Sequence, residues 1–285
     1  MNKNSLFPIT DHHMHLDPRC QGIEAARAFQ RAGGTHIFLV SKPSWTIGVT
    51  INHPDDYRKV FDETVKMAND VAQVGVTAFP VLGVHPAAIT NMCDRVGLIR
   101  TIELMKAGLE IAATYVEEGL AVGLKSGRPH YDVEPILWNA SNEILSYAMV
   151  LTREAGCALQ LHTESATQEN IKEIADMARA VGLHPGKVVK HFSSPMIKEF
   201  TDCGIWPGIL TGKGMIEEAL LQGDRFMMET DYIDDPQRPG AVLGPRTIPR
   251  KSLALYKEWG EEVFRKIHQE NPQKIYDVEI ELTTT

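Results

Sequence analysis

Leu6-Phe7-Pro8-Ile9 and Asp11-His12-His13-Met14-His15-Leu16-Asp17 form an apolar run that leads into two histidines at alternate positions. Successive side chains of a strand point to opposite faces, so His13 and His15 face the same way at a strand end. Neutral imidazole is the commonest metal ligand near pH 7, and the flanking aspartates could accept its second N–H or act as ligands. The stretch predicts a first strand that ends in a metal site, although an isolated His-x-His pair can also be a polar strand end.

Segments with strand and helix patterns alternate along the rest of the chain. Buried-strand runs such as 35–40 are each followed by a segment with helical spacing, such as 55–73. Eight alternations imply parallel strands joined by crossovers, and eight closed units make a (β/α)8 barrel. The later expected strands cover residues 76–84, 120–125, 157–162, 187–192, 205–210 and 225–231.

Two features favour this barrel over an open doubly wound sheet. The first strand is not followed by a Gly-x-Gly-x-x-Gly segment, and polar residues stand at the ends of many strands. No composition break, low-complexity tract or charge block marks a linker. The sequence therefore predicts one α/β domain, a (β/α)8 TIM barrel over residues 1–285.

Composition narrows the classes of function. The net charge of -8 and the pI near 5.8 give no overall basic footprint, which counts against strong non-specific nucleic-acid binding. Four cysteines without a Cys-x-x-Cys pair predict neither a disulfide framework nor a thiolate zinc site. The N-terminus has no signal-type apolar segment, and no apolar run approaches a membrane span. We expect a cytoplasmic protein without membrane contact, and the oligomeric state stays open.

Histidine, lysine and aspartate recur at the ends of the expected strands. In a barrel these ends converge on one mouth, where active sites lie. Each residue alone could be a strand-end cap or a turn former. The expected metal ligands are His13, His15, Lys125, His162, His191 and Asp231. Together they predict a metal centre at the mouth, with His85 at the third strand end placed to touch the substrate.

This ligand set also suggests the metal and the reaction. Imidazole and carboxylate without thiolate suit Zn, Mn, Ni, Fe or Mg, and we expect two divalent ions, with zinc as the first choice. A bound pair would activate water for hydrolysis, and Asp231 is the expected base for its proton. Arg128 and His130 are expected to hold the substrate anion, with a solvated turn as the alternative reading.

Taken together, these motifs resemble a known family. A His-x-His pair after the first strand, a His after the fifth and sixth, and an Asp after the eighth are typical of the amidohydrolase superfamily. Within it the chain is similar to the TatD-related group over nearly its entire length. The shared segments are Asp11–Asp17, Gly83-Val84-His85-Pro86, Leu161-His162-Thr163-Glu164, Val189-Lys190-His191-Phe192-Ser193, Glu229-Thr230-Asp231 and Asn271-Pro272. The resemblance implies a barrel, a metal pair and hydrolysis, usually of the phosphodiester bonds of DNA.

One segment departs from the TatD pattern. Where TatD proteins carry Gly-Glu-x-Gly with a metal-bridging Glu, this chain has Gly123-Leu124-Lys125-Ser126-Gly127. Other branches of the superfamily, such as phosphotriesterase-like lactonases, use a carbamylated lysine there. Burial and nearby cations lower a lysine pKa, and a neutral amine can capture carbon dioxide. We expect Lys125 to be carbamylated and to bridge two metals; the alternative is a lysine that faces solvent or a substrate phosphate.

Three functions remain open from the sequence. The first is a hydrolase of small-molecule or nucleic-acid phosphoesters, and the second is an amidohydrolase or lactonase acting on a C–N, lactone or ester bond. The third is a non-catalytic protein stabilised by metal.

Two further features bear on the site. The loop 232–249, with Arg238 and Arg246, is expected to form a rim over the mouth. Glu229 is expected to be either an acceptor behind a ligand or a buried layer residue.

Overall fold

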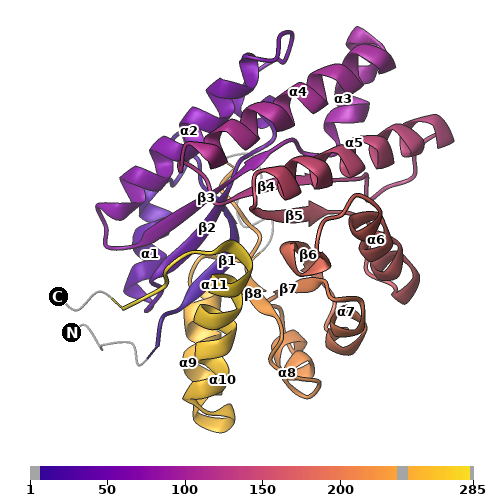
Figure 1. Cartoon of the computed structure of the whole chain (residues 1–285). Coiled ribbons are helices and arrows are strands. Elements are labelled where there is room, and N and C mark those ends of the chain that lie inside the picture. The colour runs from indigo at the N-terminus through magenta and orange to yellow at the C-terminus, as the bar shows by residue number, and fades with distance from the viewer. Residues whose placement is uncertain (1–6, 236–242, 283–285) are drawn as a thin grey trace.

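A parallel sheet with its strands in sequence order forms the centre of the molecule (Figure 1). The structure, a computed structural model, describes residues 7–235 and 243–282. In these ranges the strand order is β8-β7-β6-β5-β4-β3-β2-β1-β9, and every neighbouring pair is parallel. The strands are β1 Thr10–His15, β2 His36–Val40, β3 Thr77–Gly83, β4 Gly123–Gly127, β5 Ala158–His162, β6 Val188–Ser193, β7 Trp206–Leu210, β8 Met227–Glu229 and β9 Tyr232–Ile233.

The sheet closes through a last strand that is split in two. β8 pairs with β7. After two intervening residues, β9 pairs with β1, where Met14 lies opposite Tyr232. Between the two halves, Asp231 has a φ of 46°, a left-handed conformation that is uncommon for residues with a side chain. The predicted barrel is therefore confirmed, but the expected strand 225–231 is shortened to β8, and β9 begins beyond its expected end.

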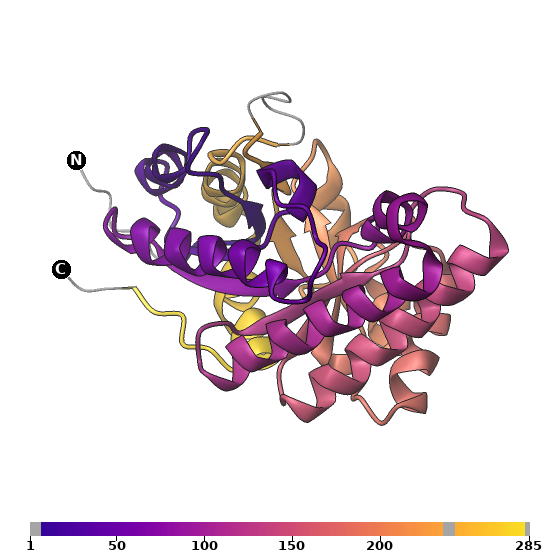
Figure 2. The same ribbon diagram turned by 90° about the horizontal axis from the view of Figure 1, so that it is seen from above.

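Helices cover the outside of the sheet, as the view from above also shows (Figure 2). They are α1 Ile23–Arg31, α2 Asp56–Ala72, α3 Ala88–Val96, α4 Leu98–Glu117, α5 Pro135–Glu154, α6 Gln168–Ala180, α7 Ile197–Cys203, α8 Met215–Leu220, α9 Thr247–Trp259, α10 Glu261–Arg265 and α11 Asn271–Tyr276. In α2, for example, Val60, Thr64, Met67 and Val71 recur every three or four residues and are buried, as an amphipathic helix requires. No helix within the described ranges is long and apolar enough to cross a lipid bilayer.

Two further segments differ from the sequence-based prediction. The fourth strand was expected at 120–125, but β4 runs from Gly123 to Gly127, because Ser126 and Gly127 pair with β5 instead of turning away. Gly127 permits this pairing: a Cβ on it would lie 1.8 Å from the carbonyl oxygen of His162. The single last helix expected at 250–269 is interrupted at Gly260, whose φ is 90°, and includes a π-helical turn at Lys266–Glu270.

The apolar core leaves only one end of the barrel open to polar residues. Inside the barrel, residues near the strand starts, such as Ala158 and Met227, pack with Tyr276 of α11 and with Ile280. These C-terminal residues close the bottom of the barrel. Larger apolar clusters fill the space between the helices and the sheet. The polar strand ends are consequently gathered at the opposite end, the mouth.

Candidate metal centre

A pocket of about 540 Å³ opens at the mouth of the barrel. Its volume lies in the range of pockets that bind one small molecule. It brings together the six residues predicted as ligands: His13, His15, Lys125, His162, His191 and Asp231. His85 and His130, predicted to bind substrate, also line it, and Trp45 and Phe192 add aromatic wall. The strand ends therefore converge as the sequence suggested.

The first donor set consists of His13, His15 and Asp231. Nε2 of His13 lies 3.2 Å from Nε2 of His15, and Oδ1 of Asp231 lies 3.8 Å from each of these nitrogens. With metal–ligand bonds of about 2.0–2.2 Å, three donors at such separations can share one ion. These atoms come from the end of β1 and from the break between β8 and β9, which are neighbours because the barrel closes there.

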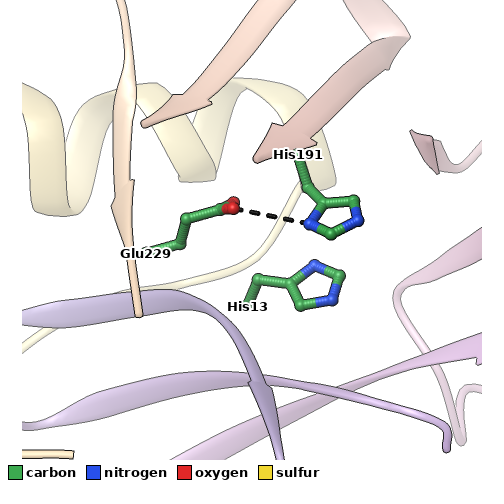
Figure 3. A group of neighbouring side chains, drawn as sticks. All are labelled: His13, His191 and Glu229. Atoms are coloured by element: carbon green, nitrogen blue, oxygen red, sulfur yellow. Dashed lines mark ion pairs between the residues drawn. The ribbon is translucent and has the colours of Figure 1, made fainter. Parts of the chain in front are cut away.

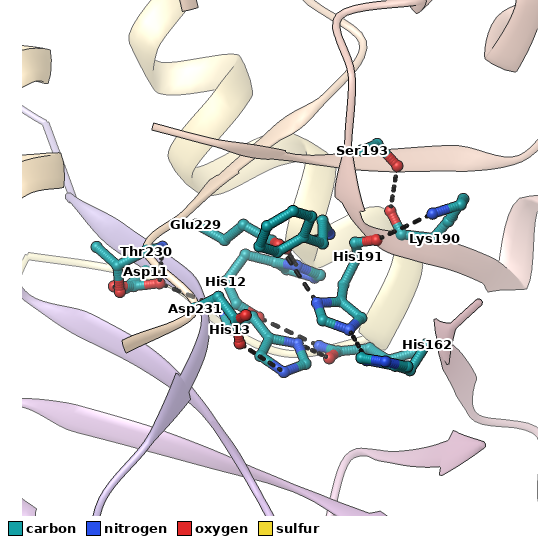
Figure 4. Close-up of polar contacts among 12 residues, drawn as sticks. Asp11, His12, His13, His162, Lys190, His191, Ser193, Glu229, Thr230 and Asp231 are labelled. Atoms are coloured by element: carbon teal, nitrogen blue, oxygen red, sulfur yellow. Dashed lines mark hydrogen bonds and ion pairs between the residues drawn. The ribbon is translucent and has the colours of Figure 1, made fainter. Parts of the chain in front are cut away.

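The second donor set consists of His162 and His191, which end β5 and β6. Nδ1 of His162 lies 2.8 Å from Nε2 of His191, and Figure 4 shows the two rings meeting beside the first set. The ring of His191 stacks on that of His13, with 4.0 Å between the centroids. The two donor sets therefore lie side by side in one pocket.

In each of these four histidines, one ring nitrogen faces the other histidine of its set. The second ring nitrogen points away from that histidine and lies near a polar group. Nδ1 of His13 and Nδ1 of His15 lie 2.8 Å from the side-chain oxygen of Gln160 and the carbonyl oxygen of Val40, respectively. Nε2 of His162 lies 2.7 Å from Nδ1 of His130, and Nδ1 of His191 lies 3.4 Å from Oε1 of Glu229, as Figure 3 shows. An oxygen acceptor keeps the hydrogen on the nitrogen it faces, so the other nitrogen presents a lone pair.

This arrangement fits divalent metal ions. Nε2 of His13 and Nε2 of His15 both present lone pairs at 3.2 Å, and such lone pairs repel unless a cation lies between them. The facing nitrogens of His162 and His191 approach each other to 2.8 Å. Burial lowers the pKa of His15 to about 3 and holds the pKa values of His13, His162 and His191 well below the ordinary range. All four rings are therefore neutral at pH 7, which is the form that binds metal.

Lys125 is a buried amine beside the first donor set. Its side chain is 3% exposed, and its Nζ lies 3.4 Å from Nε2 of His13. Burial lowers the pKa of Lys125 to about 7, although the carboxylates of Asp231 and Glu229 act in the opposite direction. A large share of this amine is consequently neutral at physiological pH, where an ordinary lysine is fully charged. Its backbone is also tightly placed, since a Cβ on Gly83 would lie 1.9 Å from the Lys125 carbonyl oxygen.

Arg128, predicted to hold a substrate anion, is placed differently from that expectation. It is 1% exposed and is not among the residues that line the pocket. Its guanidinium donates to the carboxylates of Glu164 and Glu173, and its Cζ lies 4.6 Å from the centre of the Trp138 ring. Arg128 is therefore neither a substrate contact nor part of a solvated turn. It is a buried guanidinium whose charge is compensated by carboxylates.

His85 remains positioned to contact a substrate. Its Nδ1 accepts the backbone N–H of Ala87 at 3.2 Å, so the neutral ring carries its hydrogen on Nε2. Burial and the nearby Lys125 lower the pKa of His85 to about 3. Its ring lies 4.5 Å from that of His162, centroid to centroid. His85 can therefore donate a hydrogen bond next to the second donor set without carrying a charge.

The aspartates that flank the first histidines serve the framework instead of the metal. Asp11 is buried and accepts hydrogen bonds from the N–H and the hydroxyl of Thr230, which ties β1 to the split last strand. Burial raises the pKa of Asp11 to about 7. Asp17 accepts from Arg19 and from Lys42, whose ammonium also donates to the carbonyl oxygen of Asp234. Neither aspartate contacts an imidazole of the donor sets through a hydrogen bond given by the structure.

Glu229 combines the two roles considered for it. It is fully buried, it accepts the N–H of Phe192, and its Oε1 faces His191. Gln160 has a comparable role behind His13, but only its place in an expected strand was visible in the sequence. Of the two arginines of the expected rim, Arg238 lies outside the described residues, and Arg246 directly precedes α9.

Comparisons with known proteins identify the family of the chain and agree with its barrel fold. A family model described as TatD related DNase matches residues 10–277. "Uncharacterized protein MJ1127" of Methanocaldococcus jannaschii is 40% identical over 282 residues, which are 97% of this chain and 98% of that protein. A TatD-like protein of Archaeoglobus fulgidus has a TM-score of 0.62 at 17% identity, covering 94% of this chain and 100% of the other. A mutant PTE-like lactonase of Deinococcus radiodurans has a TM-score of 0.63 at 18% identity, covering 96% and 97%.

Proposed function

The chain belongs to the TatD related DNase family, whose members are hydrolytic enzymes, and we propose that it hydrolyses a phosphoester bond with two divalent metal ions. One observation carries the proposal: two pairs of imidazole nitrogens face each other at 3.2 and 2.8 Å, and the second ring nitrogens of His13 and His15 each lie 2.8 Å from an oxygen acceptor. Facing lone pairs of this kind favour bound cations. The substrate is a small-molecule or nucleic-acid phosphoester, and the widely spaced cysteines favour a cytoplasmic location.

In this proposal each donor set holds one ion. His13, His15 and Asp231 would hold the first, and His162 and His191 would hold the second. The residue types suit zinc best, with Mn, Ni, Fe or Mg as alternatives. When bound, the ions polarise the scissile bond and lower the pKa of the attacking water.

The protein's own groups then handle the proton and the substrate oxygens. The carboxylate of Asp231 lies at the open mouth, 3.8 Å from both nitrogens of the first set, where it can take the proton from the attacking water. The neutral ring of His85 can donate its Nε2–H to an oxygen that gains charge in the transition state. The aromatic wall of Trp45 and Phe192 is available to the apolar part of the substrate.

Lys125 supplies the bridging anion in this proposal. Its neutral amine attacks the carbon of carbon dioxide and releases one proton, which leaves a carbamate with two oxygens and one negative charge. The low pKa of Lys125, caused by burial, makes the neutral amine available near pH 7. The 3.4 Å separation from Nε2 of His13 supports this role, because the amine lies beside the first donor set.

A second candidate function is hydrolysis of a small lactone, ester or C–N substrate. Lys125 favours it, because the family resemblance links a lysine at this position to the phosphotriesterase-like lactonases and not to the TatD nucleases. The 540 Å³ pocket also suits a molecule of that size. The same donor sets would serve both reactions, so the substrate alone separates the two candidates.

Elemental analysis of the purified protein, coupled to a hydrolysis panel, tests both candidates. The panel contains bis(p-nitrophenyl) phosphate, a single-stranded oligonucleotide, an aliphatic lactone and p-nitrophenyl acetate. We expect two ions per chain, and phosphodiester turnover that a chelator removes and added metal restores. Turnover of the lactone alone would favour the second candidate. A protein without bound metal and without turnover would overturn the proposal.

A further inference from the structure

We propose that the segment Gly127–His130 positions His162 and thereby sets the affinity of the second donor set for its ion. This inference rests on the two-ion site proposed above. Nδ1 of His162 faces His191 at 2.8 Å, while Nε2 of His162 lies 2.7 Å from Nδ1 of His130. If Nδ1 of His162 is the metal ligand, its Nε2 carries the hydrogen and donates it to His130. His130 is then a positioning residue, not a substrate ligand.

His130 differs in origin from the other partners behind the ligands. Gln160 and Val40 belong to β5 and β2, and Glu229 belongs to β8, so the barrel itself fixes them. His130 lies three residues beyond the end of β4 and is exposed. A residue in a loop can keep an imidazole in one orientation only if other contacts fix the position of that loop. The partner of His162 therefore depends on an anchor outside the strand.

Arg128 provides that anchor, because it holds both sides of the contact between His130 and His162. Its backbone N–H donates to the carbonyl oxygen of His162 at 3.0 Å. Its guanidinium donates to Glu164, which lies two residues after His162 in the next loop. The carboxylates of Glu164 and Glu173 raise the pKa of Arg128 above its ordinary value although burial acts against this. Arg128 thus ties the loop of His130 to the loop of His162.

The Arg128 side chain also connects the loops of His130 and His162 to the outer helices. The Arg128 guanidinium donates to Asn142 of α5 at 3.0 Å and to Glu173 of α6 at 2.7 Å. It also packs on the ring of Trp138 in α5. Planar guanidinium groups make several directed bonds at once, which lysine cannot reproduce. The loop is consequently fixed against two helices, and Pro129 restricts the backbone between Arg128 and His130.

Paired substitutions of His130 test the role directly. His130→Leu removes the acceptor, whereas His130→Gln keeps a side-chain oxygen like the one that Gln160 presents to His13. Zinc titration by calorimetry should show one unchanged ion in His130→Leu and a second ion weakened about tenfold to hundredfold, the usual effect of losing a partner behind a ligand. His130→Gln should restore most of the lost affinity. Equal affinity for both ions in His130→Leu and wild type would overturn the inference.

A measurement on the metal-free protein separates this inference from the proposed function. Nitrogen-15 NMR reports which ring nitrogen of His162 carries the hydrogen, and we expect Nε2–H in wild type and a tautomer mixture in His130→Leu. The same mixture in both proteins would contradict the positioning role. Wild type that binds fewer than two zinc ions would instead overturn the two-ion proposal, whatever the tautomer.

Substitution of Arg128 gives an independent test of the inference. Arg128→Lys keeps the charge but loses the directed bonds, so we expect it also to weaken the second ion and leave the first unchanged. Arg179→Lys is the matched control, since Arg179 likewise bonds a carboxylate, Asp176, and a backbone carbonyl, that of Cys203, and neither partner belongs to the loops of His130 and His162. Unchanged second-ion affinity in a folded Arg128→Lys protein would refute the anchor.

Discussion

The side-chain oxygen of Gln160 accepts a hydrogen bond from Nδ1 of His13 at 2.8 Å, in a fully buried setting. The amide nitrogen of Gln160 donates to the carbonyl oxygen of His12 at 3.2 Å. Gln160 therefore determines both the tautomer of His13 and the position of its backbone.

Gln160→Leu should weaken the first ion and destabilise the fold. The change removes the acceptor of the His13 Nδ1–H and a donor to the His12 carbonyl, which costs about 1–3 kcal/mol of the free energy of unfolding. Metal affinity at the first donor set should fall about tenfold to hundredfold. Urea unfolding of the metal-free protein and zinc titration measure the two effects.

Gln222→Leu is the matched control for that experiment. Gln222 bonds the backbone of Ile197 and Pro195 on the outer layer, away from the pocket residues. We expect a loss of stability without any loss of metal affinity. A Gln160→Leu protein with wild-type zinc affinity would show that the tautomer of His13 is fixed in some other way.

The sequence predicted the barrel well because alternation and strand-end chemistry are local signals. Each strand is followed by its own helix, and each ligand stands directly after an apolar run, so neither requires knowledge of distant residues. The split of the last strand was not predictable in this way. It depends on Asp231 adopting a positive φ and on Asp11 bonding Thr230, which lies 219 residues away in the chain.

The partners of the ligands were likewise beyond local reasoning. Gln160 stands 147 residues from His13, and only closure of the barrel brings them together. Arg128 illustrates the opposite error: an arginine beside proline in a loop suggests an exposed anion contact. The acidic residues that bury it come from separate segments, since Glu164 follows β5 and Glu173 lies in α6.

Replacing both His13 and His15 with alanine should remove the ion of the first donor set while the barrel remains folded. These side chains lie at the mouth, away from the apolar cluster that includes Tyr276 and closes the bottom. Mass spectrometry of the metal content and far-UV circular dichroism measure the two properties. His184→Ala, at the surface turn where His184 caps Gly186, should keep both. Full metal content in the double variant would place the first ion elsewhere.

Asp231→Asn should lower turnover by about 10²-fold or more, the usual scale for losing a general base. The amide keeps the size and one oxygen of the carboxylate, so metal content should fall less than activity. Steady-state rates and metal content of the same preparation distinguish the two effects. Turnover at the wild-type rate with metal retained would remove Asp231 from the role of base.

Carbamylation of Lys125 should rise with pH through neutrality. Burial lowers the pKa of Lys125 from 10.5 to about 7, so below pH 7 the amine is mainly protonated and unreactive, and above pH 7 it is mainly neutral. In ¹³C-labelled bicarbonate, a carbamate signal should therefore grow between about pH 6 and 8 and then level off, because protonation of a group with this pKa is nearly complete one unit below it and nearly absent one unit above. Lys125→Gln should abolish the signal.

Lys190→Gln is the control for the Lys125 variant. Lys190 is also a buried amine, and burial lowers its pKa to about 8, but it does not line the pocket. Short-chain carboxylates should restore part of the activity of Lys125→Ala by supplying the missing anion, whereas a signal that persists in Lys125→Gln, or one that falls as pH rises, would contradict the carbamate bridge.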